Sequence, residues 1–91
     1  MGIFAASDDL AMGLAHAAVA YGLKIGDDIK LVGFDGQQPR YPEDPVLTTV
    51  VVPLEEMGRA AARMALERAT DARALPRRVS FGCSLRRGQT A

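Results

Sequence analysis

Three side chains that can form hydrogen bonds with a ligand stand where short apolar runs end. Ser7 and Asp8 follow the run at 2–6, and Asp35 follows the run at 29–34. A carboxylate at the tip of a strand accepts hydrogen bonds from hydroxyl or amine groups, and a serine hydroxyl donates or accepts them. In an open parallel sheet, ligands bind outside the carboxyl ends of the strands. These residues are therefore predicted to line a ligand crevice.

Each of these residues also has a structural explanation. The Asp35 side chain can cap the loop that follows it by accepting hydrogen bonds from nearby N–H groups. Ser7 can act as the N-cap of a helix whose first turn favours the negative charge of Asp8. The pattern favours capping for Ser7 and Asp8, and it leaves both explanations open for Asp35.

The sequence offers little for catalysis. His16 is the only histidine and lies nine residues from Ser7 within a predicted helix, so no pair of nucleophile and base is indicated. Asp8, Asp9 and Asp35 could form a magnesium pocket as in phosphoryl-transfer receiver folds, but that fold needs a lysine near its late strands, and both lysines here come early. We expect no enzymatic activity and no cofactor.

The elements that must position these residues alternate along the chain. We expect strands at 2–6, 29–34, 47–52 and 79–86, with helices from Ser7 to about Tyr21 and from Pro53 to about residue 70. The order β-α-β-β-α-β predicts an α/β fold with a parallel, doubly wound sheet. One face of the first helix is predicted to be apolar and buried: Leu10, Leu14, Ala17, Ala18 and Tyr21.

Composition narrows the class of protein. The chain has 91 residues, 48% of them hydrophobic, and no formal net charge, which fits one small domain or a piece of a larger one. This balance argues against nucleic acid as the chain's own ligand. The late arginines, Arg77, Arg78, Arg86 and Arg87, are predicted to be a solvated surface. The single cysteine, Cys83, indicates a reducing compartment, and neither a membrane span nor a signal peptide is apparent.

Five stretches extend over nearly the whole chain: FAASDDLAMG, YGLKIGDDIKLVGFDG, LTTV, LEEMGRAAARMALE and LRRGQT. In this order and spacing they resemble the C-terminal part of the lactose/galactose repressor (LacI/GalR) family of bacterial transcription regulators. The resemblance implies a cytoplasmic homodimer with no membrane partner. Its periplasmic-binding-protein-like domain would have two lobes, with a sugar or related metabolite bound between them. A separate N-terminal helix-turn-helix domain would bind operator DNA.

On this resemblance the chain corresponds to about the last quarter of such a regulator. Residues 1–50 would belong to the C-terminal lobe, 54–76 would supply a helix to the N-terminal lobe, and 79–91 would return to the first lobe. The DNA-binding headpiece would be absent, so this segment itself is not expected to bind DNA. A part of a periplasmic sugar-binding protein of the same fold is the alternative.

The resemblance also assigns residues. Asp35 matches the family's effector-contacting aspartate, and Ser7 stands where many members place an asparagine or serine in the pocket; Asp8 lies beside Ser7 at the same strand end. The family's dimer-forming surface corresponds to part of the first helix and the loop after Asp35: Met12, His16, Tyr41 and Glu43.

Overall fold

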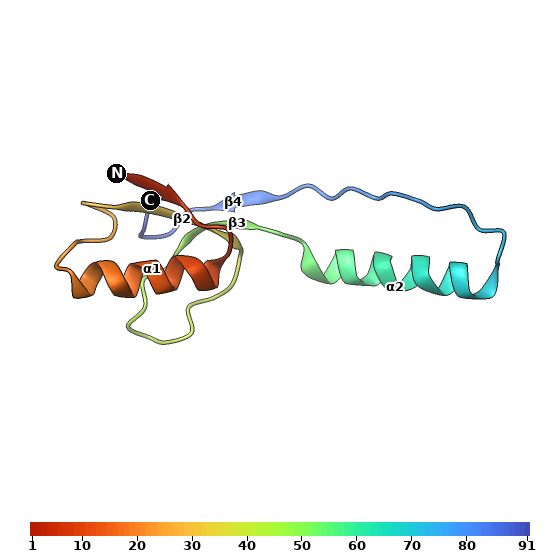
Figure 1. Ribbon diagram of the computed structural model, residues 1–91, viewed down its shortest axis with the longest axis horizontal. Coiled ribbons are helices and arrows are strands. Elements are labelled where there is room, and N and C mark those ends of the chain that lie inside the picture. Colours follow the sequence, from red (N-terminus) through yellow and green to blue (C-terminus); the bar gives the residue numbers. More distant parts are fainter. The chain divides into compact units, whose positions relative to one another are not determined.

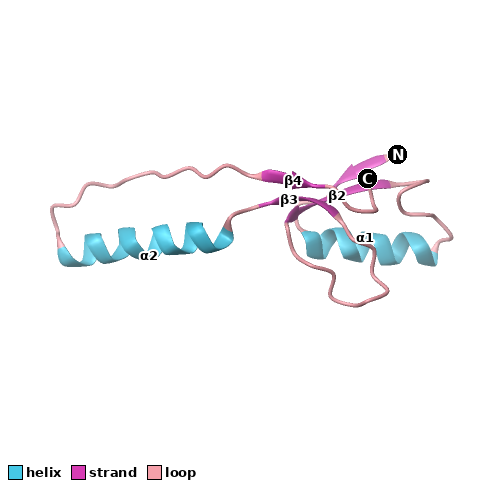
Figure 2. Ribbon diagram, turned by 180° about the vertical axis from the view of Figure 1, so that it is seen from behind, coloured by secondary structure: helices cyan, strands magenta, loops and turns pink.

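A computed structural model describes residues 1–91, and it contains four strands and two helices in the predicted order (Figures 1 and 2). Contacts divide the chain into two compact units, residues 1–52 with 83–91 and residues 53–82. The elements are β1 (Gly2–Phe4), α1 (Asp8–Ala20), β2 (Lys30–Asp35), β3 (Thr48–Val51), α2 (Leu54–Thr70) and β4 (Ser84–Arg86).

The first unit is built on a four-stranded sheet in the order β1-β2-β3-β4. β1, β2 and β3 are parallel, as predicted, but β4 runs antiparallel to β3. Ser84, the first residue of β4, pairs with Val51, the last residue of β3. The chain therefore leaves the sheet at the carboxyl end of β3 and re-enters it beside that same end. β4 must then run in the direction opposite to β3. The predicted strand at 79–86 is also too long, because only Ser84–Arg86 pairs.

Helix α1 covers one face of this sheet (Figure 1). Ser7 caps it, since the Leu10 N–H donates to Ser7 Oγ over 3.2 Å. The predicted buried face is wrong for Leu10, Ala17 and Tyr21, which are exposed, and confirmed for Ala18, which is buried. Ala11 and Ala15, which the pattern did not include, are also buried. Small side chains allow the helix to approach the sheet closely. The core comprises buried Ala5, Ala11, Ala15, Leu31 and Leu47, with Ile3, Met12, Leu14 and Ile25 packed against it.

The other face of the sheet has no helix of this unit over it (Figure 2). Side chains alternate between the two faces along a strand. Phe4, Phe34 and Leu85 therefore point away from α1. The Phe4 and Phe34 rings meet edge to face with their centres 6.5 Å apart. Phe4 is 63% exposed and Leu85 is 62% exposed, so this face of the sheet presents solvent-exposed apolar side chains.

The last residues of the chain tie β2 to β3. Thr90 is fully buried; its Oγ1 donates to the Leu31 carbonyl over 2.7 Å and accepts from the Thr48 N–H over 2.9 Å. The Leu31 N–H in turn donates to the Thr90 carbonyl over 2.7 Å. Gly88 passes so close to the segment just before β3 that a Cβ there would collide with the Val46 carbonyl oxygen. The tail thus lies tightly across the amino ends of these strands.

The second unit contains α2, which begins directly after Pro53 as the sequence predicts. Glu55 and Glu56 lie in its first turn, where the helix dipole favours negative charge. Arg59 pairs with Glu55 over 2.6 Å, one turn apart on an exposed surface. Neither α1 nor α2 combines the length and the apolar character needed to cross a lipid bilayer.

Candidate functional site

Asp35 ends β2 with an unusual backbone conformation. Its φ is 127°, a value that residues with a side chain rarely adopt, and Gly36 follows with a φ of 83°. The side chain is half-buried, and no protein group donates a hydrogen bond to its carboxylate. Strained residues gather at functional sites, where the surrounding structure holds them in place. The carboxylate of Asp35 therefore stays free to accept hydrogen bonds from a ligand.

Ser7 lies at the same edge of the sheet as Asp35. β1 and β2 are parallel neighbours with Phe4 opposite Val32, so the ends of these two strands lie side by side. Ser7 follows Phe4, and Asp35 follows Val32, by the same number of positions. The Ser7 oxygen accepts the capping hydrogen bond from α1, which leaves its hydroxyl proton for another acceptor.

Asp8 has a different environment from Asp35. It is 3% exposed, and both of its carboxylate oxygens accept hydrogen bonds from protein groups. Oδ1 accepts from the Thr49 hydroxyl over 2.6 Å, and Oδ2 accepts from the Gln37 N–H over 2.7 Å. Gly33 makes room for this carboxylate, because a Cβ at that position would lie 2.2 Å from Oδ1. In this geometry Asp8 holds the loop after β2, and any effect on a ligand would pass through that loop.

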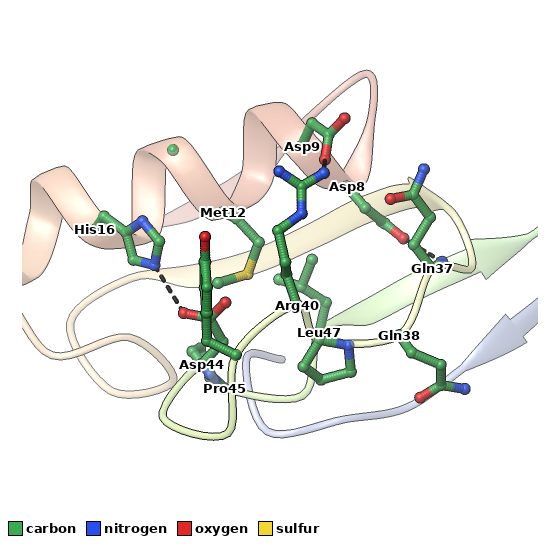
Figure 3. Close-up of a pocket in the computed structure, with 13 residues that line it drawn as sticks. Asp8, Asp9, Met12, His16, Gln37, Gln38, Arg40, Asp44, Pro45 and Leu47 are labelled. Atoms are coloured by element: carbon green, nitrogen blue, oxygen red, sulfur yellow. Dashed lines mark hydrogen bonds and ion pairs between the residues drawn. The ribbon is translucent and has the colours of Figure 1, made fainter.

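The predicted dimer residues line two adjoining hollows between α1 and the loop at 36–46, the first of which is shown in Figure 3. Met12, His16 and Tyr41 line one of about 240 Å³, and Glu43 lines the second together with His16 and Tyr41. His16 Nε2 lies 2.8 Å from Asp44 Oδ1, whose side chain is only 5% exposed. This contact joins the loop to the helix. His16 and Tyr41 line both hollows, so the four predicted residues border one connected region.

Charged groups also flank the first hollow. Arg40 reaches from the loop to Asp9 on α1, with 3.6 Å between Nη2 and Oδ1 (Figure 3). Both side chains are largely exposed, so this pair adds little to stability. No group of three acidic, histidine or cysteine side chains is placed to hold a metal ion. Cys83 is free and exposed, and it lies just before β4 although the predicted strand at 79–86 included it.

Arg86 is the residue of this region that sequence reasoning missed. Its Nη1 donates to the Gly36 carbonyl over 3.2 Å and its Nη2 to the Gln37 carbonyl over 2.8 Å. The residue is half-buried, so the prediction of a solvated surface is wrong for this member of the late arginine group. The sequence next to Arg86 indicates this role only through its position after Leu85 in a short strand. Its hydrogen-bond partner Gly36 lies 50 positions earlier, so local patterns do not reveal the contact.

Comparisons with known proteins identify the family. A family model described as a periplasmic binding protein-like domain matches residues 1–91. The HTH-type transcriptional regulator GntR of Escherichia coli (strain K12) is 34% identical over 87 residues, which are 96% of this chain and 26% of GntR. A LacI family transcriptional regulator from Lactobacillus casei, solved with bound sucrose, matches with a TM-score of 0.78 and 32% identity over 99% of this chain and 33% of that chain.

This chain belongs to the LacI/GalR family. The lac repressor dimer, solved bound to operator and the anti-inducer ONPF, matches with a TM-score of 0.81 and 26% identity, over 98% of this chain and 27% of the repressor. The relatives are regulators, so the alternative of a periplasmic sugar-binding protein is not favoured. This LacI/GalR chain spans only about a quarter to a third of each of these proteins.

Proposed function

We propose that this chain is the effector-binding and dimerisation segment of a LacI-type bacterial transcriptional regulator that works in the cytoplasm without catalysis. The observation that carries the proposal is the free carboxylate of Asp35, held at the carboxyl edge of the sheet beside the Ser7 strand end. Relatives solved with sucrose or with an anti-inducer support a small sugar-like effector.

Asp35 and Ser7 suit a ligand that carries hydroxyl groups. A carboxylate accepts hydrogen bonds from two neighbouring hydroxyls, and the Ser7 hydroxyl donates to a ring or hydroxyl oxygen. Hydrogen bonds to a charged group are stronger than neutral ones, so Asp35 is expected to contribute most of the polar affinity. Asp8 contributes by holding the loop that follows Asp35.

The remaining parts of the proposal concern how the segment is used. Residues 1–50 form part of the C-terminal lobe, residues 54–76 supply a helix to the N-terminal lobe, and residues 79–91 return to the first lobe. The division of the chain into two compact units supports this assignment. The surface of Met12, His16, Tyr41 and Glu43 pairs with the same surface of a second copy. Operator DNA is bound by a separate domain and not by this segment.

The test is effector binding by the intact regulator that contains this chain. Calorimetry with a panel of mono- and disaccharides that includes sucrose identifies a sugar that binds. Asp35→Asn is then expected to weaken that binding roughly 10- to 100-fold, because a hydrogen bond to a charged group is lost.

Asp27→Asn is the matched control, since Asp27 is an exposed turn residue. The control is expected to bind as the unmodified protein does. Equal affinity of the Asp35 and Asp27 variants would contradict the proposed site, provided that both variants show the same thermal unfolding temperature.

A further inference from the structure

The turn after β2 is held in a tight and costly conformation. Asp35 and Gly36 both have positive φ, and only the second is a glycine. A Cβ on Gly36 would lie 3.0 Å from the Val51 Cα, so the turn also passes very close to β3. A conformation of this kind persists only where neighbouring groups fix it.

Two charged side chains fix this turn. Asp8 Oδ2 accepts from the Gln37 N–H over 2.7 Å, and Asp8 is itself held by the Thr49 hydroxyl. Arg86 donates from Nη1 to the Gly36 carbonyl and from Nη2 to the Gln37 carbonyl. Three of the polar backbone groups directly after Asp35 are thus bound by a carboxylate and a guanidinium.

Arg86 adopts this position at a cost. Its Nε is buried and has no hydrogen-bond partner, so the folded state loses the hydration of this donor without a replacement. The two charge-assisted bonds of the guanidinium to the turn offset that cost. The planar fork of arginine reaches both carbonyls at once, which a lysine ammonium on a flexible stem does not do.

We propose that Arg86 is a positioning residue for effector recognition: its guanidinium, together with Asp8, holds the Gly36–Gln37 turn and so sets the direction of the Asp35 carboxylate. Arg86 acts through the turn and does not touch the effector. This inference rests on the proposed function for the role of Asp35. The stabilisation of the turn by Arg86 is measurable without any effector.

The first measurement is hydrogen–deuterium exchange of the intact regulator, followed by mass spectrometry at residues 34–40. In Arg86→Ala the Gln37 N–H is expected to exchange about tenfold faster or more, because its hydrogen bond to Asp8 opens more often. Arg87→Ala is the matched control: Arg87 is the adjacent arginine, and it is exposed. Exchange in Arg86→Ala equal to that in Arg87→Ala would overturn the inference.

Exchange at Leu31 and Thr49, which are fully buried, shows whether a variant is folded. If exchange at these core amides is also faster in Arg86→Ala, the Arg86→Lys variant is used to test the inference. Lysine keeps the positive charge but lacks the planar guanidinium that reaches both carbonyls. Faster exchange at Gln37 in a folded Arg86→Lys supports the inference. Exchange of the Gln37 N–H in Arg86→Lys that is as slow as in Arg87→Ala would overturn the inference.

The second measurement links the turn to the effector. With a sugar that binds the unmodified regulator, Arg86→Ala is expected to weaken binding about tenfold and Arg87→Ala to leave it unchanged. Unchanged affinity in Arg86→Ala, with the turn loosened, would overturn the positioning role. If no sugar in the panel binds the unmodified regulator, the proposed effector class fails, and the exchange measurement still decides whether Arg86 holds the turn.

Discussion

The two faces of the four-stranded sheet differ in what they present and in what covers them. Toward α1, Leu31 and Thr49 have no exposed surface, and the Asp8 carboxylate is buried between helix and sheet. On the opposite face, Phe4 and Leu85 are more than half exposed. A sheet with parallel strands usually has both faces covered, so the open face of this unit carries apolar residues typical of a covered one.

The difference between the two faces shows how the Asp8 carboxylate is accommodated in a small core. On the covered face, the small side chain of Ala11 and the missing side chain of Gly33 leave space for the Asp8 carboxylate. Its oxygens are satisfied by a hydroxyl and a backbone N–H, which a buried carboxylate requires. The open face has large apolar groups and needs no such arrangement.

The largest effect is expected for Leu31→Ala, which breaks the covered face. Leu31 has no exposed surface and lies in the centre of the core. The substitution is expected to lower the free energy of unfolding by about 2–5 kcal/mol, measured by urea denaturation. A loss below about 1 kcal/mol would show that the covered face is not the main core.

An intermediate effect is expected for Gly33→Ala, which forces a methyl group onto the Asp8 carboxylate. Overpacking of this kind costs about 1–3 kcal/mol. Gly13→Ala is the control, because Gly13 lies in α1 with open space around its Cβ position and is expected to gain up to about 1 kcal/mol. Thermal unfolding of the two variants in opposite directions is the expected result, and shifts in the same direction would refute the packing argument.

The smallest effect is expected for Leu85→Thr on the open face. Leu85 is 62% exposed, and threonine is well accommodated in strands. The free energy of unfolding is expected to change by less than about 0.5 kcal/mol in urea denaturation of the 91-residue chain. A loss comparable to that of Leu31→Ala would show that this face is buried under the conditions of the measurement, and the contrast between the faces would not hold.

Much of this arrangement was predictable from local sequence. The Ser7 cap, the strand run before Asp35 and the helix after Pro53 are set by residues next to one another, and all three are found in the structure. The buried face of α1 was predicted only in part, because Leu10 and Tyr21 outweigh small alanines in a hydrophobic pattern. Small residues are buried here because the helix packs closely over Gly33, which sequence periodicity does not record.

The candidate site was only partly predictable for a similar reason. The position of Asp35 at a strand end follows from the run that precedes it, but the roles of Asp8 and Arg86 depend on distant partners. Asp8 is bound by Gln37, 29 positions later, and Arg86 binds Gly36, 50 positions earlier. The direction of β4 also depends on where the chain rejoins the sheet, which local propensity does not determine.

The contact between Thr90 and Leu31 has a consequence for how the protein is made. The two residues are 59 positions apart, and the hydroxyl of the later one satisfies backbone groups on strands that leave the ribosome long before it. In a nascent chain, the Leu31 carbonyl and the Thr48 N–H therefore lack this partner until residue 90 has left the ribosome. Until residue 90 emerges, those backbone groups remain available to chaperones or to strands of other chains.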